Sequence, residues 1–390
     1  MRTLRRIRRQ LDAVVAATPA DRERWVDFLR VFAIGVVILW HWSLSVVHWS
    51  GDRLVMPNPI DHVPGGWLYT WLLQIVPVFF IVGGYANNAS WASARRDGDG
   101  WRRYLARRLR RLLVPVTVFA GLWLAFEVVM HLVVPGYPGV LSYAWIVFTP
   151  LWFIGAYTGV VLLVPVTATL HSRAPQATLA ALAGAVVVAD IGRFAFDVGA
   201  LTWVNTGLVW VLIHQFGYFY QDGTLLRMGR SAGVALTVGG LALLTAMTTF
   251  GPYPGSMVAT SEQDFSNILP TTATIAAVAL LQFGLILLLR DRMNRWLRQP
   301  EAWRPVVAAN SVILTIFVWH MTAALIALAL YRAVGGVLLA EPTALWWEQR
   351  FVWVVLPALF LVPFVVLFGR LEAGGLMRSR PRDLSGRTTS

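Results

Sequence analysis

Two residue types are missing from the 390-residue sequence. It contains no cysteine, which excludes disulfides, thiolate metal sites, palmitoylation and an acyl-thioester formed on the enzyme. It also contains no lysine, so all 33 basic residues are arginine. Charged residues make up only 14% of the chain, against roughly 25% in soluble domains. The composition therefore argues against an ordinary soluble protein.

Long apolar runs account for most of the chain, which is 57% hydrophobic with a mean hydropathy of +0.60. Each run is close to the roughly 20 residues that a helix needs to cross a bilayer. We predict an all-α polytopic membrane protein in which about ten transmembrane helices form one bundle. The predicted spans are 28–47, 67–86, 111–134, 144–166, 176–191, 200–220, 232–250, 268–289, 306–331 and 345–369.

The arginines are distributed unevenly around these spans. With a cytoplasmic N-terminus, 29 of the 33 arginines fall in cytoplasmic segments, as the positive-inside rule requires. Both termini are therefore expected in the cytoplasm, and a nucleic-acid partner is not expected despite a sequence pI of about 11. We predict three regions: a basic segment at 1–23, a ten-helix membrane domain at 24–370, and a disordered basic tail at 371–390.

The first span carries ionisable residues that an apolar helix would normally exclude. Arg30 and His41 are eleven residues apart, which places both on one helical face and separates them by roughly 16 Å. Asp27 precedes Arg30 by three residues, and Ser45 is expected to continue the face beyond His41. Two interpretations fit this pattern. His41 is either a neutral structural residue in an interhelical hydrogen bond or a functional residue that faces a cavity.

The second span is interrupted by Gln74 and Pro77 and ends with Gly83 and Gly84. Small residues of this kind serve close helix packing, but they also permit a ligand to approach the backbone. The glycines alone do not distinguish these two interpretations. An outer loop at 250–270 is rich in turn-forming residues, so it is expected to lie over a site on the outer face.

An arginine cluster opens the third span in "RRDGDGWRRYLARRLRRLLVP". Arg107, Arg108, Arg110 and Arg111 recur at spacings of three and four residues, which brings guanidinium groups together on the helix. Such a cluster can anchor the helix to anionic membrane lipid. It can also hold the oxygens of a polyphosphate in bidentate hydrogen bonds.

Five stretches together resemble the bacterial integral-membrane acyltransferase-3 family. The first helix has the Arg-x10-His spacing, "PVFFIVGGYANNASW" resembles the family's second helix, and "RRLRRLLVP" resembles its double arginine before a proline. "LWFIGAYTGVVLLVP" and "NSVILTIFVWHMT" resemble the fourth helix and a late helix ending in Trp-His. The similarity covers residues 24–370 in the right order, although Arg107/Arg110 and Arg108/Arg111 fit the double-arginine motif equally well.

The resemblance implies a plasma-membrane O-acyltransferase that moves an acyl group, expected to be acetyl, from cytoplasmic acyl-CoA to a hydroxyl of a cell-envelope glycan or glycolipid. Acyl-CoA is then a co-substrate, and no metal is expected. His41 is expected to act as general base or as nucleophile, with Asp27 holding Arg30 in place. The residues expected to bind the donor or stabilise the oxyanion are Arg30, Tyr85, Asn87, Arg107, Arg108, Arg110 and Arg111.

His320 and Ser45 are weaker candidates for the acceptor site. His320 would orient the acceptor or balance a proton, although a structural hydrogen bond explains it equally well. A proton-coupled transporter is the alternative function, because such carriers also place histidine and glutamate at mid-membrane. The absence of an internal repeat and the dense arginine cluster argue for the enzyme.

Overall fold

The structure is a computed structural model that describes residues 9, 11–260 and 265–377. Helices dominate it, and its only named strands, β1 (His48–Ser50) and β2 (Arg53–Val55), form one antiparallel hairpin within these residues. The helices, with the short turns between them, are α2 (Arg24–Leu39), a π-turn (Trp40–Leu44), a 3-10 turn (Pro59–His62), α3 (Trp67–Leu73), α4 (Val76–Arg96), α5 (Trp101–Val133), α6 (Val140–Tyr143), a 3-10 turn (Trp145–Phe148), α7 (Leu151–Arg173), α8 (Pro175–Phe196), α9 (Ala200–Gln221), α10 (Thr224–Arg227), α11 (Gly229–Phe250), α12 (Ala273–Trp296), α13 (Pro300–Asn310), α14 (Ile313–Ala333), α15 (Ala344–Glu348) and α16 (Arg350–Met377).

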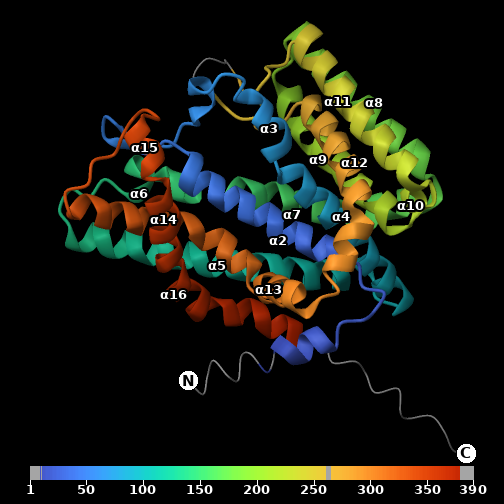
Figure 1. The fold of residues 1–390 in the computed structure, drawn as a ribbon, viewed down its shortest axis with the longest axis horizontal. Coiled ribbons are helices and arrows are strands. Elements are labelled where there is room, and N and C mark those ends of the chain that lie inside the picture. Colours follow the sequence, from blue (N-terminus) through green and yellow to red (C-terminus); the bar gives the residue numbers. More distant parts are fainter. Residues whose placement is uncertain (1–8, 10, 261–264, 378–390) are drawn as a thin grey trace, which may run out of the picture.

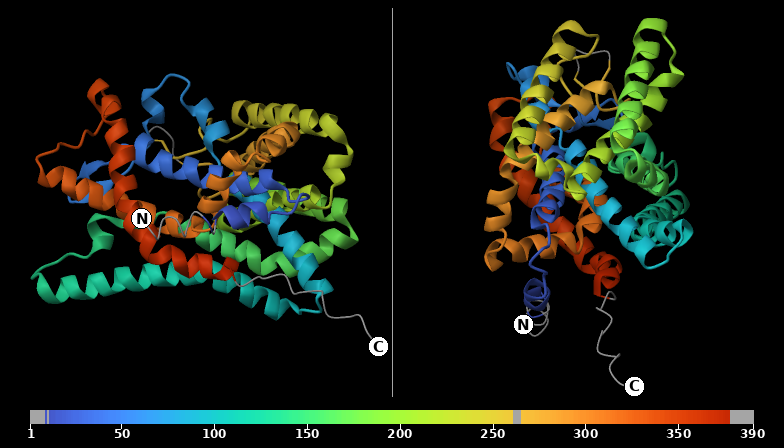
Figure 2. Two further views of the ribbon diagram at one scale, coloured as in Figure 1. Left: turned by 60° about the horizontal axis from the view of Figure 1, so that its bottom comes forward. Right: turned by 90° about the vertical axis from the view of Figure 1, so that its right-hand side faces the viewer.

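In the described part of the chain, nine helical segments have the length and apolar composition to cross a membrane, which confirms the all-α polytopic prediction. The predicted span at 200–220 is α9, which has the length but is less apolar than the others. In Figure 1, α8, α9, α11 and α12 form one side of the bundle and α5, α14 and α16 the other, with α2, α4 and α7 between them. Figure 2 shows the length of the teal α5, which has 33 residues.

The second half of helix α9 is buried within the bundle, in a continuous run from Val209 to Tyr220. It crosses α4 at two glycines that touch backbone to backbone. A Cβ on Gly84 would collide with the carbonyl oxygen of His214, and a Cβ on Gly217 would collide with the backbone of α4. The structure thus assigns Gly84 to close helix packing.

The second predicted span is divided into α3 and α4 by a break at Gln74 and Ile75. The break leaves carbonyl oxygens of α3 without their usual partners, which is costly inside a membrane. Gln282 of α12 compensates, because its side-chain amide donates to the carbonyl oxygens of Leu72 at 3.1 Å and Gln74 at 2.9 Å. The helix break predicted from Gln74 and Pro77 is confirmed, and a side chain from a distant helix stabilises it.

The first predicted span does not continue as an α-helix to residue 47. Helix α2 ends at Leu39, a π-turn carries His41, and Ser45 already has an extended backbone with φ −82° and ψ 138°. The expectation that Ser45 continues the helical face beyond His41 is therefore wrong. π-turns of this kind are often found at functional sites because they redirect side chains locally.

Two other boundaries differ from the sequence prediction. The span expected at 306–331 is divided into α13 and α14, because the chain turns at Ser311 and Val312. The basic tail expected at 371–390 begins later, because α16 continues to Met377 and its Glu372 accepts hydrogen bonds from the first turn of α14. The remainder of that tail, and residues 1–8 of the basic N-terminal segment, lie outside the described residues.

Candidate active site

Two neighbouring cavities occupy the middle of the bundle. The larger, of about 610 Å³, is lined by His41 and is called the histidine chamber here. The smaller, of about 220 Å³, is lined by Arg30, Arg108 and Arg111 and is called the arginine chamber. Both cavities share the side chains of Ile34, Phe79, Phe153 and Phe317, which form an apolar collar between them. The site therefore has two chambers of different chemistry separated by one layer of apolar side chains.

A pair of nearly coplanar imidazole rings, which meet edge to edge, lies at the edge of the histidine chamber. His41 Nδ1 lies 2.9 Å from His320 Nε2, and the two ring planes are 6° from parallel. His320 is fully buried and does not line the chamber, whereas His41 is partly exposed to it. The structure thus brings together two histidines that are 279 residues apart in the sequence.

The hydrogen bonds determine which nitrogen carries each proton when both rings are neutral. His320 Nδ1 lies 2.5 Å from the carbonyl oxygen of Phe317, which can only accept, so this nitrogen must be the donor. His320 Nε2 is then an acceptor, and His41 Nδ1 must donate to it. The lone pair of His41 therefore resides on Nε2, which makes no hydrogen bond within the described part of the chain. The pair leaves an unprotonated basic nitrogen at the chamber.

Ser45 lines the same chamber but does not pair with His41. Its hydroxyl donates to the carbonyl oxygen of Trp40 at 3.4 Å, which also accepts from the backbone nitrogen of Ser45 at 3.1 Å. The hydrogen bond of Ser45 therefore gives no direct support to the acceptor-binding role expected of it. The π-turn is also attached to α14, because Trp42 Nε1 donates to the carbonyl oxygen of His320.

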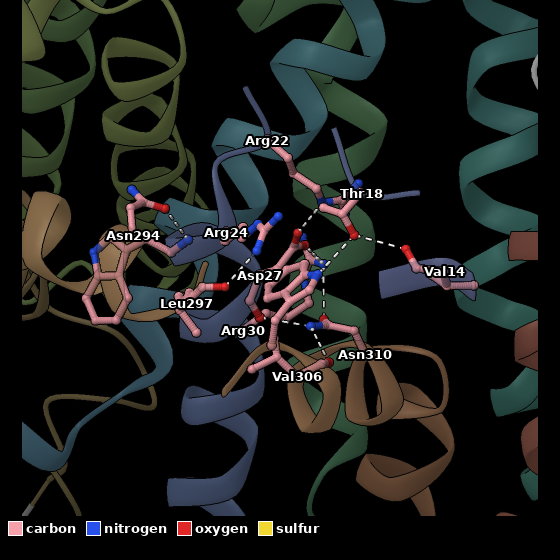
Figure 3. Close-up of polar contacts among 12 residues, drawn as sticks. Val14, Thr18, Arg22, Arg24, Asp27, Arg30, Asn294, Leu297, Val306 and Asn310 are labelled. Atoms are coloured by element: carbon pink, nitrogen blue, oxygen red, sulfur yellow. Dashed lines mark hydrogen bonds and ion pairs between the residues drawn. The ribbon is translucent and has the colours of Figure 1, made fainter. Parts of the chain in front are cut away.

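Arg30 lies near the middle of α2, eleven residues before His41, and lines the arginine chamber. Asp27 accepts from Arg30 at 3.3 Å and from Arg22 at 2.7 Å, so the predicted contact between Asp27 and Arg30 is present (Figure 3). Asn310 completes the group, because its side chain accepts from Arg30 and donates to the carbonyl oxygen of Asp27. This group fixes Arg30 on the wall of the arginine chamber and does not reach His41.

Arg108 and Arg111 are the two members of the arginine cluster that line this chamber. The Arg108/Arg111 register of the double-arginine motif is therefore the one that faces the cavity. Arg107 instead forms an ion pair with Asp99, and Arg110 is exposed. The four arginines expected to act together thus divide into two that face the cavity and two that do not.

Asn87 holds Arg108 in position through a fully satisfied amide. Its Oδ1 accepts from Nε of Arg108 at 3.0 Å and also from Nη2 of the same side chain. Its Nδ2 donates to His214 Nε2 at 3.0 Å and to the hydroxyl of Tyr157 at 3.3 Å. Because His214 and Tyr157 determine the orientation of the amide, they indirectly position the guanidinium of Arg108.

Tyr85 does not line the arginine chamber, although the sequence placed it beside Asn87. It packs against Tyr220 with ring centroids 5.2 Å apart, on another face of α4. Four residues near the chamber were missed by sequence reasoning: Tyr157, His214, Asn310 and Glu372. Asn310 and His214 offered a signal, because each is a polar residue inside a predicted apolar span.

Comparison with protein-family models matches residues 23–370 to an acyltransferase domain, the acyltransferase-3 family. No curated protein and no solved structure matches the chain. The matched region contains every helix from α2 to α15 and all the lining residues of both chambers except Glu372, so it covers nearly the whole candidate site. The protein therefore belongs to the acyltransferase-3 family and is a multi-pass membrane acyltransferase.

Proposed function

We propose that the protein transfers an acyl group, acetyl in the simplest case, from acyl-CoA to a hydroxyl of a cell-envelope glycan or glycolipid. In this proposal the protein lies in the plasma membrane with the arginine chamber toward the cytoplasm. The donor enters through the arginine chamber, and the acceptor reaches the histidine chamber from the other side. The observation that carries the proposal is the pair of chambers, with cations in one and an unprotonated imidazole nitrogen in the other.

The arginine chamber suits the phosphates of acyl-CoA. Arg30, Arg108 and Arg111 line it, and the one carboxylate there, Glu372, accepts hydrogen bonds from Leu314 and Thr315 instead of an arginine. Arg30 is paired with Asp27, whereas Arg108 and Arg111 have no ion-pair partner within the described residues, so two positive charges of the chamber remain for a ligand. The narrow, uncharged pantetheine arm of the donor would then extend through the collar toward His41. Membrane lipid headgroups would contact the exposed Arg107 and Arg110.

His41 would act as the general base in the transfer step. Its Nε2 removes the proton from the acceptor hydroxyl, and the oxygen attacks the thioester carbonyl to form the new C–O bond. The C–S bond then breaks, and the proton passes from His41 to the sulfur of CoA. The products are the ester and free CoA, so the step needs no further reactant. His320 would orient His41 and stabilise its protonated form, as the third member of a triad does.

A release assay with purified protein tests this function. The protein in a detergent without hydroxyl groups is incubated with acetyl-CoA, with or without an extract of envelopes from its source cells. We expect free CoA to appear only with the extract, and not with the His41→Ala protein. If the wild-type protein releases no CoA with any extract, the proposed donor is wrong. A radiolabelled acyl group that remains on the protein would assign His41 as nucleophile instead of base.

A further inference from the structure

The histidine chamber is predominantly apolar, although it is expected to receive a hydroxyl compound. Among the described residues, no arginine, aspartate or glutamate lines it. Sugars usually require many hydrogen-bonding partners, because burying an unpaired hydroxyl costs about 1–3 kcal/mol. The chemistry of the lining therefore restricts the acceptor that can enter.

Most polar side chains of this chamber already have partners in the protein. Asn58 accepts from Trp40 at 2.8 Å and donates to Ala259 at 3.0 Å, so both ends of its amide are occupied. Thr70 donates to Trp67 and accepts from the backbone nitrogen of Met257. These groups stabilise the chamber walls and offer little to a ligand.

Few polar side-chain groups without a partner remain available in the described lining. They are Nε2 of His41, the side-chain amide of Gln74, and the indole nitrogens of Trp145 and Trp152. The hydroxyl of Thr149 also lacks a partner, but its oxygen is buried in the wall. So few groups match one reacting hydroxyl and its close neighbours, but not a chain of sugars.

The end of the chamber beyond His41 is covered by the segment that follows α11. Val258, Ala259, Ile268 and Leu269 of this segment line the cavity. Hydrogen bonds attach the segment to α3, including one from Trp71 Nε1 to the carbonyl oxygen of Gly255 at 2.9 Å. The predicted position of the 250–270 loop over a site is thus confirmed for its described residues.

The side of the chamber, in contrast, is bordered by exposed apolar side chains. Leu141 is 67% exposed and Trp145 is 49% exposed, and both line the cavity. Leu73 and Leu269 are also exposed and line it. Trp145 begins the candidate membrane span Trp145–Arg173 and Leu141 lies just before it, so both belong at the edge of the bilayer, where exposed apolar side chains contact lipid and tryptophan is common. We infer that the acceptor is a hydroxyl-bearing amphiphile dissolved in the bilayer, which enters the histidine chamber sideways past Leu141 and Trp145. The inference rests on the proposed function and selects a lipid acceptor over a water-soluble glycan.

A fractionation experiment tests the acceptor class. Envelopes of the source cells are separated into an organic-solvent lipid extract and an aqueous extract, and each is added to the purified protein with acetyl-CoA. We expect the lipid extract to release CoA and the aqueous extract to release none. Release with the aqueous extract, alone or together with the lipid extract, overturns the lipid acceptor while leaving the proposed function intact. Release with neither extract contradicts the proposed function itself.

A pair of matched substitutions tests the entry route. Leu141→Arg places a charge at the side opening, whereas Leu132→Arg places it at an 81% exposed position on α5 that does not line the chamber. We expect Leu141→Arg to raise the KM for the lipid extract at least tenfold and Leu132→Arg to leave it unchanged. Leu269→Arg, from the opposite border, replaces Leu141→Arg if that protein fails to fold. Equal effects at Leu132 and at the opening overturn sideways entry.

Discussion

The arginine chamber and the histidine chamber share four side chains but differ in almost every other property. The arginine chamber is the smaller and is lined by three guanidinium groups, with one buried asparagine holding Arg108 in place. The histidine chamber is about three times larger, is predominantly apolar, and contains one imidazole with an unpartnered nitrogen. The difference separates two requirements of acyl transfer: a polyanionic donor needs fixed cations, whereas a neutral base is favoured by surroundings without charge.

The largest expected effect comes from a substitution that disables the histidine chamber and leaves the arginine chamber unchanged. Replacing His41 by alanine removes the proposed base, and general-base catalysis typically contributes about 10²–10⁴-fold to the rate. We expect kcat to fall by at least 10²-fold while the KM for acetyl-CoA stays near its original value. His131→Ala is the control, because His131 is an exposed histidine that lines neither chamber. CoA release measures both variants, and a near-normal rate without His41 would leave it a structural residue.

The arginine chamber is tested by changing arginine to lysine, which keeps the charge but loses the bidentate geometry. We expect Arg108→Lys and Arg111→Lys to raise the KM for acetyl-CoA about 10- to 100-fold, which corresponds to about 1.5–3 kcal/mol for a charge-assisted hydrogen bond. Arg110→Lys should leave it unchanged, because Arg110 does not line the chamber. An unchanged KM in all three variants would assign the cluster to lipid anchoring.

A smaller effect is expected from His320, which we regard as a positioning residue. His320→Ala should lower kcat roughly tenfold, because His41 loses a hydrogen bond worth about 1 kcal/mol that determines its tautomer. His320→Gln keeps an acceptor atom and should recover part of the rate, while the KM for acetyl-CoA stays constant in both. The pH dependence of kcat separates positioning from folding, because only a change at His41 shifts the profile. If kcat falls equally in both variants and the pH profile is unchanged, His320 has only a structural role.

The orientation of the two chambers is tested by labelling, with no expected effect on activity. The chain has no cysteine, so each introduced cysteine is unique. The two substitutions are Asp52→Cys and Asp97→Cys. Asp52 lies in the hairpin near the histidine chamber, and Asp97 follows α4, close to the arginine-rich start of α5. A membrane-impermeant maleimide added to whole cells should label position 52 and spare position 97. The opposite pattern would place the arginine chamber outside the cell.

The sequence predicted the helical bundle well because each apolar run is itself the evidence for a membrane helix. It also predicted that Asp27 contacts Arg30, since three residues on a helix bring side chains together. Helix α9 shows that hydropathy alone can miss a helix of the bundle. Its Asn205, His214 and Gln215 reduce its apolar character, but neighbouring helices bury these side chains and each of the three has a hydrogen-bond partner in the structure.

The pairing of His41 with His320 was not predictable from spacing. The two residues come from α14 and from a π-turn, and their contact depends on how distant helices pack. The choice between Arg107/Arg110 and Arg108/Arg111 could not be made from the sequence for a related reason. The neighbouring helices determine which side of α5 faces the chamber. Tyr85 was misplaced because residues two positions apart on a helix point about 200° apart, so Asn87 faces the chamber and Tyr85 does not.

The apolar collar also has an electrical consequence. Two cavities that approach from opposite sides would form a conducting path if water filled the space between them, but Ile34, Phe79, Phe153 and Phe317 interrupt that path. The membrane potential then falls mainly across this layer, where moving one elementary charge costs about 2.3 kcal/mol per 100 mV. In the proposed reaction the charged phosphates remain on the arginine side, and the acyl group crosses in exchange for the proton that leaves on the sulfur of CoA, so no net charge crosses. Such a transfer would do no work against the membrane voltage and would not discharge ion gradients.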